Sequence, residues 1–366
     1  MKLKFVMPEE VMIGNKTITN LKTRIAGSGF NNILFLISTD FETNTYLKKI
    51  INKYTNKAIV WIDPCMLEED SISKISEDLD QRHIEFAFII GNSKTINIAK
   101  ISLLAHVNNI KNVYGDCNDE MFDRTIPFAV VASEPYDASG ASNCIKLMHN
   151  KRLLSYYSDA FIPRYFIVDF KIMLIQNHGA FKNYLLSKIV IGLDMYFLDK
   201  KNIVGSCFSL GAVEMIYHEA QNMISNEASY ETLTILAHAD YSLIMAENML
   251  RQNNRITIRE SVEYLYRNLS IKNIPLDLVI SSLCFNILDY YNNKNEDFDI
   301  ISKKLFINFD IDSYQGVVKS LEVWCRKFNI KTDSMCWLTE EDWHILYEAI
   351  NSHRDKKIIK ELRNIL

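Results

Sequence analysis

The chain has 366 residues, of which 48% are hydrophobic and 23% charged, and its formal net charge is −4. This is the composition of an ordinary globular protein, and the mild acidity gives no electrostatic reason to expect a nucleic-acid partner or an anionic membrane surface. The seven cysteines never adopt a C-x-x-C spacing and are odd in number, which indicates reduced thiols rather than a disulfide scaffold.

The amino-terminal residues, Met1 to Pro8, lack the long apolar stretch of a secretory signal. No window of the sequence approaches the length needed to span a bilayer. We therefore expect a cytoplasmic protein, and its length predicts a division into two domains.

The first half of the chain alternates short β-branched or aromatic runs with segments of helical periodicity, which is typical of β-α-β units. The predicted strands span residues 32–38, 58–62 and 85–90, and the predicted helices lie at about 46–54, 68–82 and 95–105. Strands that alternate with helices in this way predict a mostly parallel sheet with right-handed crossovers. A ligand would then bind at the carboxyl ends of the strands.

Two more strand-like runs follow at residues 126–132 and 164–169, and between them lies a loop rich in small residues at 133–142. Beyond about residue 171 the apolar positions recur mainly at helical spacing. We therefore predict an α/β domain over residues 1–172 and a helical domain over 173–366. Near the carboxyl end, Thr339 and Ser352 are predicted to cap two final helices, at 340–351 and through Leu366.

The most informative local feature is an apolar strand that breaks at Gly91 and restarts as a helix. The free N–H groups of a helix's first turn can hold a pyrophosphate, so this turn predicts a nucleotide site. Such turns usually carry several glycines, whereas here Asn92 and Ser93 place side chains in the space that a ligand would use. The alternative is a plain strand-to-helix turn in which Asn92 or Ser93 caps the helix and no ligand binds.

Three segments together resemble the iron-containing alcohol dehydrogenase and glycerol dehydrogenase family of the dehydroquinate synthase-like superfamily. Gly91–Lys100 matches G-G-G-S-x-x-D-x-A-K, Ile126–Pro135 matches an I-P-T strand with a T-G-S-E or S-T-D-A-P loop, and Pro163–Asp169 matches P-x-x-x-x-V-D. The resemblance extends from about residue 5 to about residue 290. It implies an α/β Rossmann-like nucleotide-binding domain followed by an all-α domain that binds a divalent metal.

The resemblance also implies a bound NAD or NADP. Asp40 follows the first predicted strand, where a carboxylate can accept a hydrogen bond from the adenosine ribose, although it could equally cap the following helix. Asn97 stands where the motif usually has aspartate. The residues that the resemblance assigns to the dinucleotide and the adjoining cleft are Asp40, Gly91, Asn92, Ser93, Asn97, Ser133 and Glu134.

The metal site is where the chain departs from the family pattern. Asp194 is retained as a remnant ligand, but Leu198, Val262, Tyr266 and Leu276 occupy positions where family members place histidines. An alkyl side chain has no lone pair and cannot replace an imidazole as a zinc or iron ligand. We therefore expect an incomplete metal site. The sequence has no histidine between His238 and His344 that could complete it.

Without a metal, a side chain must act as general acid or base, and the sequence does not select one. His218 and His238 are candidates, and each could instead be an ordinary structural or surface histidine. A metal site reassembled from Asp194 with either histidine stays open as well.

Three functions remain open at this point. The first is an NAD(P)-dependent oxidoreductase acting on an alcohol, a polyol or a related carbonyl, including small-molecule or peptide-borne substrates. The second is a catalytically silent homologue that serves as the partner subunit or scaffold of another enzyme. The third is a cyclase or lyase of the dehydroquinate synthase kind. The resemblance further implies a homodimer or a hetero-oligomer with a pathway partner.

Overall fold

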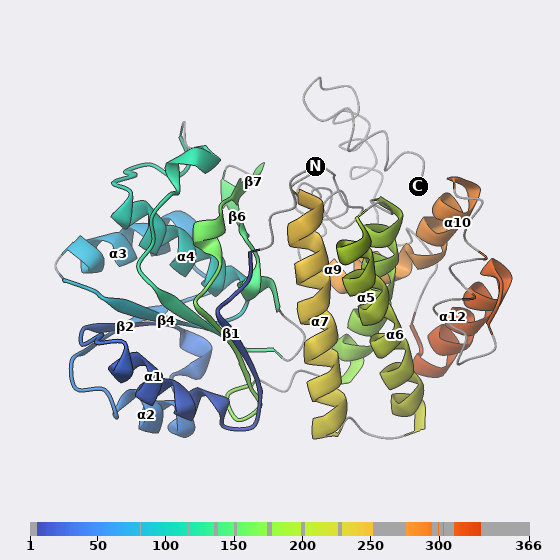
Figure 1. Cartoon of the computed structure of the whole chain (residues 1–366), viewed down its shortest axis with the longest axis horizontal. Helices are drawn as coiled ribbons and strands as arrows, with labels where there is room; N and C mark the ends of the chain where they lie inside the picture. The colour runs from blue at the N-terminus through green and yellow to red at the C-terminus, as the bar shows by residue number, and fades with distance from the viewer. Residues whose placement is uncertain are drawn as a thin grey trace. The chain divides into compact units, whose positions relative to one another are not determined.

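The structure is a computed structural model that describes residues 6–80, 82–115, 118–134, 138–149, 152–173, 178–198, 202–225, 229–251, 276–294, 299, 303 and 311–330. The chain divides into two compact units, Met1–Ile175 and Gln176–Leu366. The first unit is α/β and the described part of the second is helical (Figure 1).

The first unit is built on a six-stranded sheet in which every neighbouring pair is parallel, in the order β1-β8-β5-β4-β2-β3. This confirms the predicted parallel sheet. The strands are β1 Glu10–Gly14, β2 Ile33–Ser38, β3 Lys57–Ile62, β4 Phe86–Gly91, β5 Phe128–Ala132 and β8 Tyr165–Asp169.

Helices cover both faces of this sheet. α1 (Leu21–Gly27) and α2 (Thr45–Ile51) lie on one face, and α3 (Glu68–Asp80) and α4 (Ser93–Val107) lie on the other (Figure 1). Five short 3-10 helices occur in the connections, namely η1 Thr17–Asn20, η2 Thr39–Phe41, η3 Asp119–Met121, η4 Ala138–Ala141 and η5 Asp159–Phe161. The four inner strands are therefore buried on both faces, which is why their sequences are continuous apolar runs.

The sequence did not predict β1, α1 or the antiparallel hairpin of β6 (Cys144–His149) and β7 (Arg152–Tyr157). β1 is an outer strand in which only Met12 is buried, so its sequence carries little hydrophobic signal. The hairpin carries only a weak signal, because Lys146 separates buried Ile145 from buried Leu147 but Cys144 is also buried.

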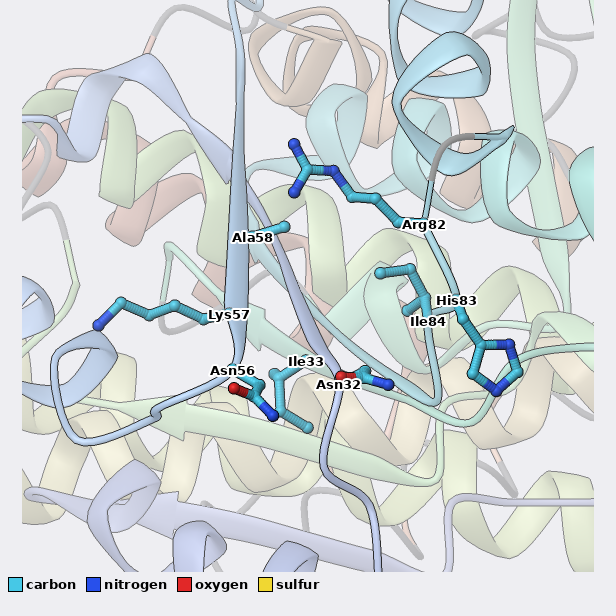
Figure 2. Close-up of a pocket in the computed structure, with 8 residues that line it drawn as sticks. All are labelled: Asn32, Ile33, Asn56, Lys57, Ala58, Arg82, His83 and Ile84. Atoms are coloured by element: carbon cyan, nitrogen blue, oxygen red, sulfur yellow. The ribbon is translucent and has the colours of Figure 1, made fainter.

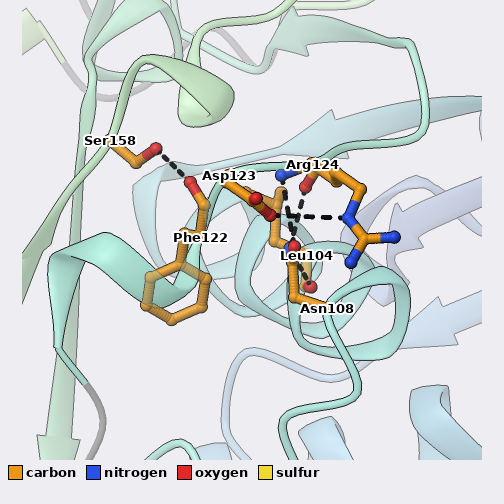
Figure 3. A network of polar contacts seen from close by, with 6 residues as sticks. All are labelled: Leu104, Asn108, Phe122, Asp123, Arg124 and Ser158. Carbon is orange, nitrogen blue, oxygen red and sulfur yellow. Dashed lines mark hydrogen bonds and ion pairs between the residues drawn. The ribbon is translucent and has the colours of Figure 1, made fainter.

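The carboxyl end of α4 is fastened to the segment that leads into β5 (Figure 3). The Asn108 side chain donates to the carbonyl oxygens of Leu104 and Arg124, both at 2.8 Å, and accepts from the Arg124 N–H at 3.2 Å. Ser158, just after β7, donates to the Phe122 carbonyl at 2.5 Å. These bonds fix the path of the chain from α4 to the start of β5.

The described helices of the second unit are α5 His178–Leu198, α6 Ile203–Ser225, α7 Tyr230–Arg251, α9 Leu276–Ser282, α10 Cys284–Lys294 and α12 Tyr314–Phe328. Gly192 lets α5 approach its neighbours, because a Cβ at this position would lie 2.4 Å from Val213 of α6 and 3.1 Å from Leu243 of α7. The two helices predicted after residue 339 lie outside the described residues. Among the helices that the structure describes, none is both long and apolar enough to cross a bilayer.

Candidate functional site

The candidate site lies at the carboxyl edge of the sheet, where the chain leaves β2 and β4 toward opposite faces. β2 continues through η2 to α2 on one face, while β4 runs directly into α4 on the other (Figure 1). In open parallel sheets ligands bind outside such a reversal point. Asp40 follows β2, Gly91 ends β4 and Ser133 follows β5, so the fold brings these predicted residues to one edge. The Ser133 N–H donates to the Gly91 carbonyl at 3.1 Å.

Asn92 is the N-cap of α4. Its side chain accepts a hydrogen bond from the Thr95 N–H at 3.0 Å, and its carbonyl accepts from the Ile96 N–H at 2.9 Å. The capping role that the sequence left open for this residue is thus present. The cap does not use the first two N–H groups of the helix, those of Ser93 and Lys94, which have no hydrogen-bond partner within the described residues.

Gly91 is explained by packing within the turn. A Cβ at Gly91 would lie 2.7 Å from both Cβ and Cγ2 of Thr95, so only glycine fits against this side chain. The prediction from the sequence, that the backbone at Gly91 comes close to a pyrophosphate, is a separate one and stays a prediction. Thr95 is fully buried, and among the described residues its hydroxyl oxygen has no hydrogen-bond partner. A buried polar group of this kind is costly unless a further partner satisfies it.

Asp40 is exposed at the end of β2, and the buried Ser38 hydroxyl donates to its carboxylate at 2.8 Å. α2 is capped by Asn44, whose side chain accepts from the Leu47 N–H at 2.9 Å. The alternative in which Asp40 caps the following helix is therefore wrong. Its carboxylate is held by Ser38 and faces outward, available to a ligand.

The loop after β5 is fastened to α4 by two contacts. Ser139 donates to the hydroxyl of Ser93 at 3.2 Å. Lys100, which is fully buried in α4, donates to the carbonyl oxygens of Gly140 at 2.7 Å and Ser142 at 3.1 Å. The sequence contained Lys100 within a motif but gave it no role, because its partners lie some forty residues along the chain.

Two other predicted residues lie beside this turn. Asn97 is partly exposed one turn further along α4, and Glu134 follows Ser133 with a partly exposed side chain.

Lys94 donates to the carbonyl oxygens of Pro64 at 2.6 Å and Met66 at 2.9 Å, which joins the loop after β3 to the start of α4.

Asp169 ends β8 in the third motif and is a structural residue. Its fully buried carboxylate accepts from the N–H groups of Lys16 at 3.0 Å, Ile18 at 3.1 Å and Lys171 at 2.9 Å. The Tyr46 hydroxyl donates to it at 3.4 Å. The carboxylate thus ties β8 to the segment after β1 and to α2.

This contact makes stability depend on pH in the alkaline range. Burial, followed by the neighbouring Asp169 charge, raises the pKa of Tyr46 from its ordinary value of 10.0 to about 12. The folded state therefore holds this proton more tightly than the unfolded state, so the stabilisation is complete below pH 10 and is lost as the pH rises toward 12. We expect the unfolding free energy of Tyr46→Phe to fall less steeply over this window. Parallel curves for the two proteins would contradict this.

In the helical unit, Asp194 lies on α5 with 1% of its surface exposed, and the Tyr291 hydroxyl of α10 donates to its carboxylate. His218 and His238 are exposed, so they do not share its buried environment. Among the described residues no three His, Cys, Asp or Glu side chains gather in a way that could hold a metal. Of the positions where the family has histidines, Val262 and Tyr266 lie outside the described residues.

The same unit holds a buried polar cluster that the sequence did not reveal. Lys188 of α5 lies 2.5 Å from the carboxylate of Asp240 on α7, with side-chain exposures of 8% and 0%. The Tyr184 hydroxyl donates to the same carboxylate at 2.8 Å, and the Lys188 ammonium lies 4.8 Å from the centre of the Tyr184 ring. Because all three side chains are buried, we assign this cluster to the packing of α5 against α7.

A pocket of about 320 Å³ lies at the opposite, amino edge of the sheet. It is lined by Asn32, Ile33, Asn56, Lys57, Ala58, Arg82, His83 and Ile84. Figure 2 shows the side chains of Lys57 and His83 extending in opposite directions. Its cationic groups do not converge on a common point, so the pocket does not form an anion site.

No protein-family model and no curated protein sequence matches this chain. Solved structures do match it over its whole length, and they show that its fold is that of the iron-containing alcohol dehydrogenases, with a Rossmann-like first domain and an all-helical second domain. The predicted fold class is thereby confirmed.

Three of these structures illustrate the likeness. A 1,3-propanediol oxidoreductase has a TM-score of 0.82 at 12% identity, with 100% of each chain covered. An iron-containing alcohol dehydrogenase from Thermococcus thioreducens has a TM-score of 0.80 at 11% identity, with 99% of each chain covered. A sulfoacetaldehyde reductase from Bifidobacterium kashiwanohense, in complex with NAD+, has a TM-score of 0.78 at 12% identity, covering 100% of this chain and 99% of the other.

Proposed function

We propose that this chain is an NAD(P)-dependent oxidoreductase that acts on an alcohol, a polyol or a related carbonyl compound. The observation that carries the proposal is the amino end of α4 at the reversal point of the sheet, between Asp40 and Ser133. Its first two N–H groups have no partner among the described residues. Its structural neighbours include an oxidoreductase, an alcohol dehydrogenase and a reductase in complex with NAD+, which supports this choice.

In this proposal the pyrophosphate binds at the first turn of α4. The N–H groups of Ser93 and Lys94 would donate to its oxygens, and the positive end of the helix dipole would favour the negative charge. The buried hydroxyl of Thr95 lies in the same turn and would gain a partner if it or a bridging water contacted the ligand.

Asp40 leads us to expect NAD rather than NADP. A carboxylate at this place accepts a hydrogen bond from the ribose 2′-hydroxyl, whereas it repels a 2′-phosphate. We expect NADH to bind about tenfold more tightly than NADPH, because like charges at close range cost on the order of 1 kcal/mol.

Titrations of both dinucleotides into wild type and Asp40→Ala check this expectation, with the preference for NADH reduced in the variant. Glu42→Ala removes a neighbouring exposed carboxylate and is the matched control. Equal affinities for the two dinucleotides in the wild type would show that Asp40 does not face the ribose.

The described residues do not fit the metal centre that this fold family implies. Asp194, which the resemblance gives as the remnant metal ligand, accepts a hydrogen bond from the Tyr291 hydroxyl. Leu198, one turn further along α5, offers no donor atom. Hydride transfer from an alcohol still requires a group that takes the hydroxyl proton.

Ser93→Asp tests the binding site without weakening the helix. An acidic residue in the first turn of α4 favours the helix dipole, so stability should stay the same or rise by about 0.3–1 kcal/mol. The same charge would repel a pyrophosphate, and we expect NADH affinity to fall by about tenfold or more. Ser93→Ala, which also loses the Ser139 contact, is the matched control. If Ser93→Asp bound NADH as tightly as Ser93→Ala, the site would lie elsewhere.

A further inference from the structure

β3 is an outer strand of the sheet, and within the described residues it pairs only with β2. The Ile33 N–H of β2 donates to the Asn56 carbonyl at 3.1 Å, and Ile33 is in register with Lys57. Since neighbouring residues of a strand direct their backbone groups to opposite sides, Ala58 and Val60 face β2. Lys57, Ile59 and Trp61 then direct their N–H and C=O groups to the free edge.

The side chains along this edge are apolar and only partly covered. Ala58, Val60 and Ile62 are buried, whereas Ile59 is 40% exposed and Trp61 is partly exposed. Outer strands are usually protected from pairing by charges, proline or a bulge. Between Lys57 and Ile62 the strand has no proline and no charge after its first residue. Within the part of the chain that the structure describes, this edge is therefore open to pairing with another strand.

We propose that β3 of a second copy of this chain pairs antiparallel with this edge, about a two-fold axis that passes at Val60. This register places Ile59 opposite Trp61 and Lys57 opposite Asp63, and the symmetry repeats each pair. The edge residues Ile59 and Trp61 are then hydrogen-bonded partners, since both direct their backbone groups outward. The two sheets become one continuous sheet.

Several antiparallel registers pair the outward-facing residues with one another, and the charges of Lys57 and Asp63 favour this one. A shift of two residues in one direction places Lys57 opposite Trp61, and a shift in the other direction leaves Lys57 beyond the end of the partner strand. In both cases Lys57 no longer lies opposite Asp63. In the proposed register two opposite-charge pairs flank two pairs of Ile with Trp. Cross-strand pairs of these kinds each contribute about 0.2–1 kcal/mol.

One force opposes the pairing. α3 carries six acidic residues, Glu68, Glu69, Asp70, Glu77, Asp78 and Asp80, against one lysine, and it lies on one face of the same sheet. Two copies bring these charges closer together. Salt at about 0.3 M shortens the range of this repulsion to roughly 5–6 Å while leaving backbone hydrogen bonds in place, so association is measured under that condition.

A cross-link tests the register in the full chain. In the proposed dimer the two Val60 residues form a pair without mutual hydrogen bonds, with Cα atoms about 4.5 Å apart. A disulfide spans such a distance. We expect Val60→Cys to form a covalent dimer under mild oxidation that wild type does not form. Ala58→Cys is the matched control, because its two copies would lie about 13 Å apart. Equal cross-linking of both variants, or none at Val60→Cys, would overturn the register.

Sedimentation velocity tests the surface without a new cysteine. Ile59→Pro removes an N–H that faces the free edge and breaks no bond to β2. We expect wild type and Ile59→Val to sediment as dimers, and Ile59→Pro as a monomer with a circular dichroism spectrum like that of wild type. Ile59→Lys is a second variant with the same expected loss, should the proline prevent folding. A monomeric wild type, or a dimer that survives both substitutions, would overturn the proposal.

Discussion

We expect Lys188→Met to lower the free energy of unfolding of the helical unit by about 3–5 kcal/mol. Lys188 and Asp240 form a buried ion pair at 2.5 Å, and the Tyr184 hydroxyl also donates to the Asp240 carboxylate. Removing the lysine takes its positive charge away from a carboxylate that has no surface exposure. Urea denaturation followed by circular dichroism measures the loss.

The double variant Lys188→Met/Asp240→Leu is the control for this prediction. Replacing both members of a buried ion pair by apolar residues is often neutral or stabilising. We therefore expect the double variant to recover most of the stability that the single variant loses. If the two variants were equally destabilised, the loss would come from the shape of the side chain at residue 188 and not from its charge.

Lys100→Met is the second substitution for which we expect a large loss, about 2–4 kcal/mol. The fully buried Lys100 ammonium donates to the carbonyl oxygens of Gly140 and Ser142, and methionine would leave both acceptors without this donor. Each buried group left unsatisfied costs about 1–3 kcal/mol. The loop that carries Ser139 would also be released from α4, so NADH affinity should fall with stability.

Lys49→Met is the matched control for Lys100→Met, because Lys49 is exposed on α2 of the same unit. We expect its unfolding free energy to lie within about 0.5 kcal/mol of wild type. A Lys100→Met variant as stable as Lys49→Met would show that the loop does not depend on the buried ammonium.

The parts of the fold that could be predicted are those whose signal is local. β2, β4, β5 and β8 are buried on both faces, so each is an uninterrupted apolar run. β1 could not be predicted in this way, because only Met12 is buried among five residues. The parallel arrangement followed from the alternation of strands with helices.

The candidate site could be predicted where a residue directly follows a strand. Asp40, Gly91 and Ser133 meet at one edge because parallel strands end on the same side of a sheet. The partners of Lys100, Asp169 and Lys188 lie far along the chain, so spacing could not reveal them. Sequence reasoning did not find the packing reason for Gly91, since the side chain that excludes a Cβ belongs to Thr95.

The central claim is that the amino end of α4 binds the pyrophosphate of a nicotinamide dinucleotide. A crystal structure of the wild-type chain grown with NADH tests it most directly. We expect pyrophosphate oxygens within hydrogen-bond distance of the N–H groups of Ser93 and Lys94, with the adenosine ribose beside Asp40. A dinucleotide bound away from α4, or crystals without it at saturating NADH in solution, would contradict the account.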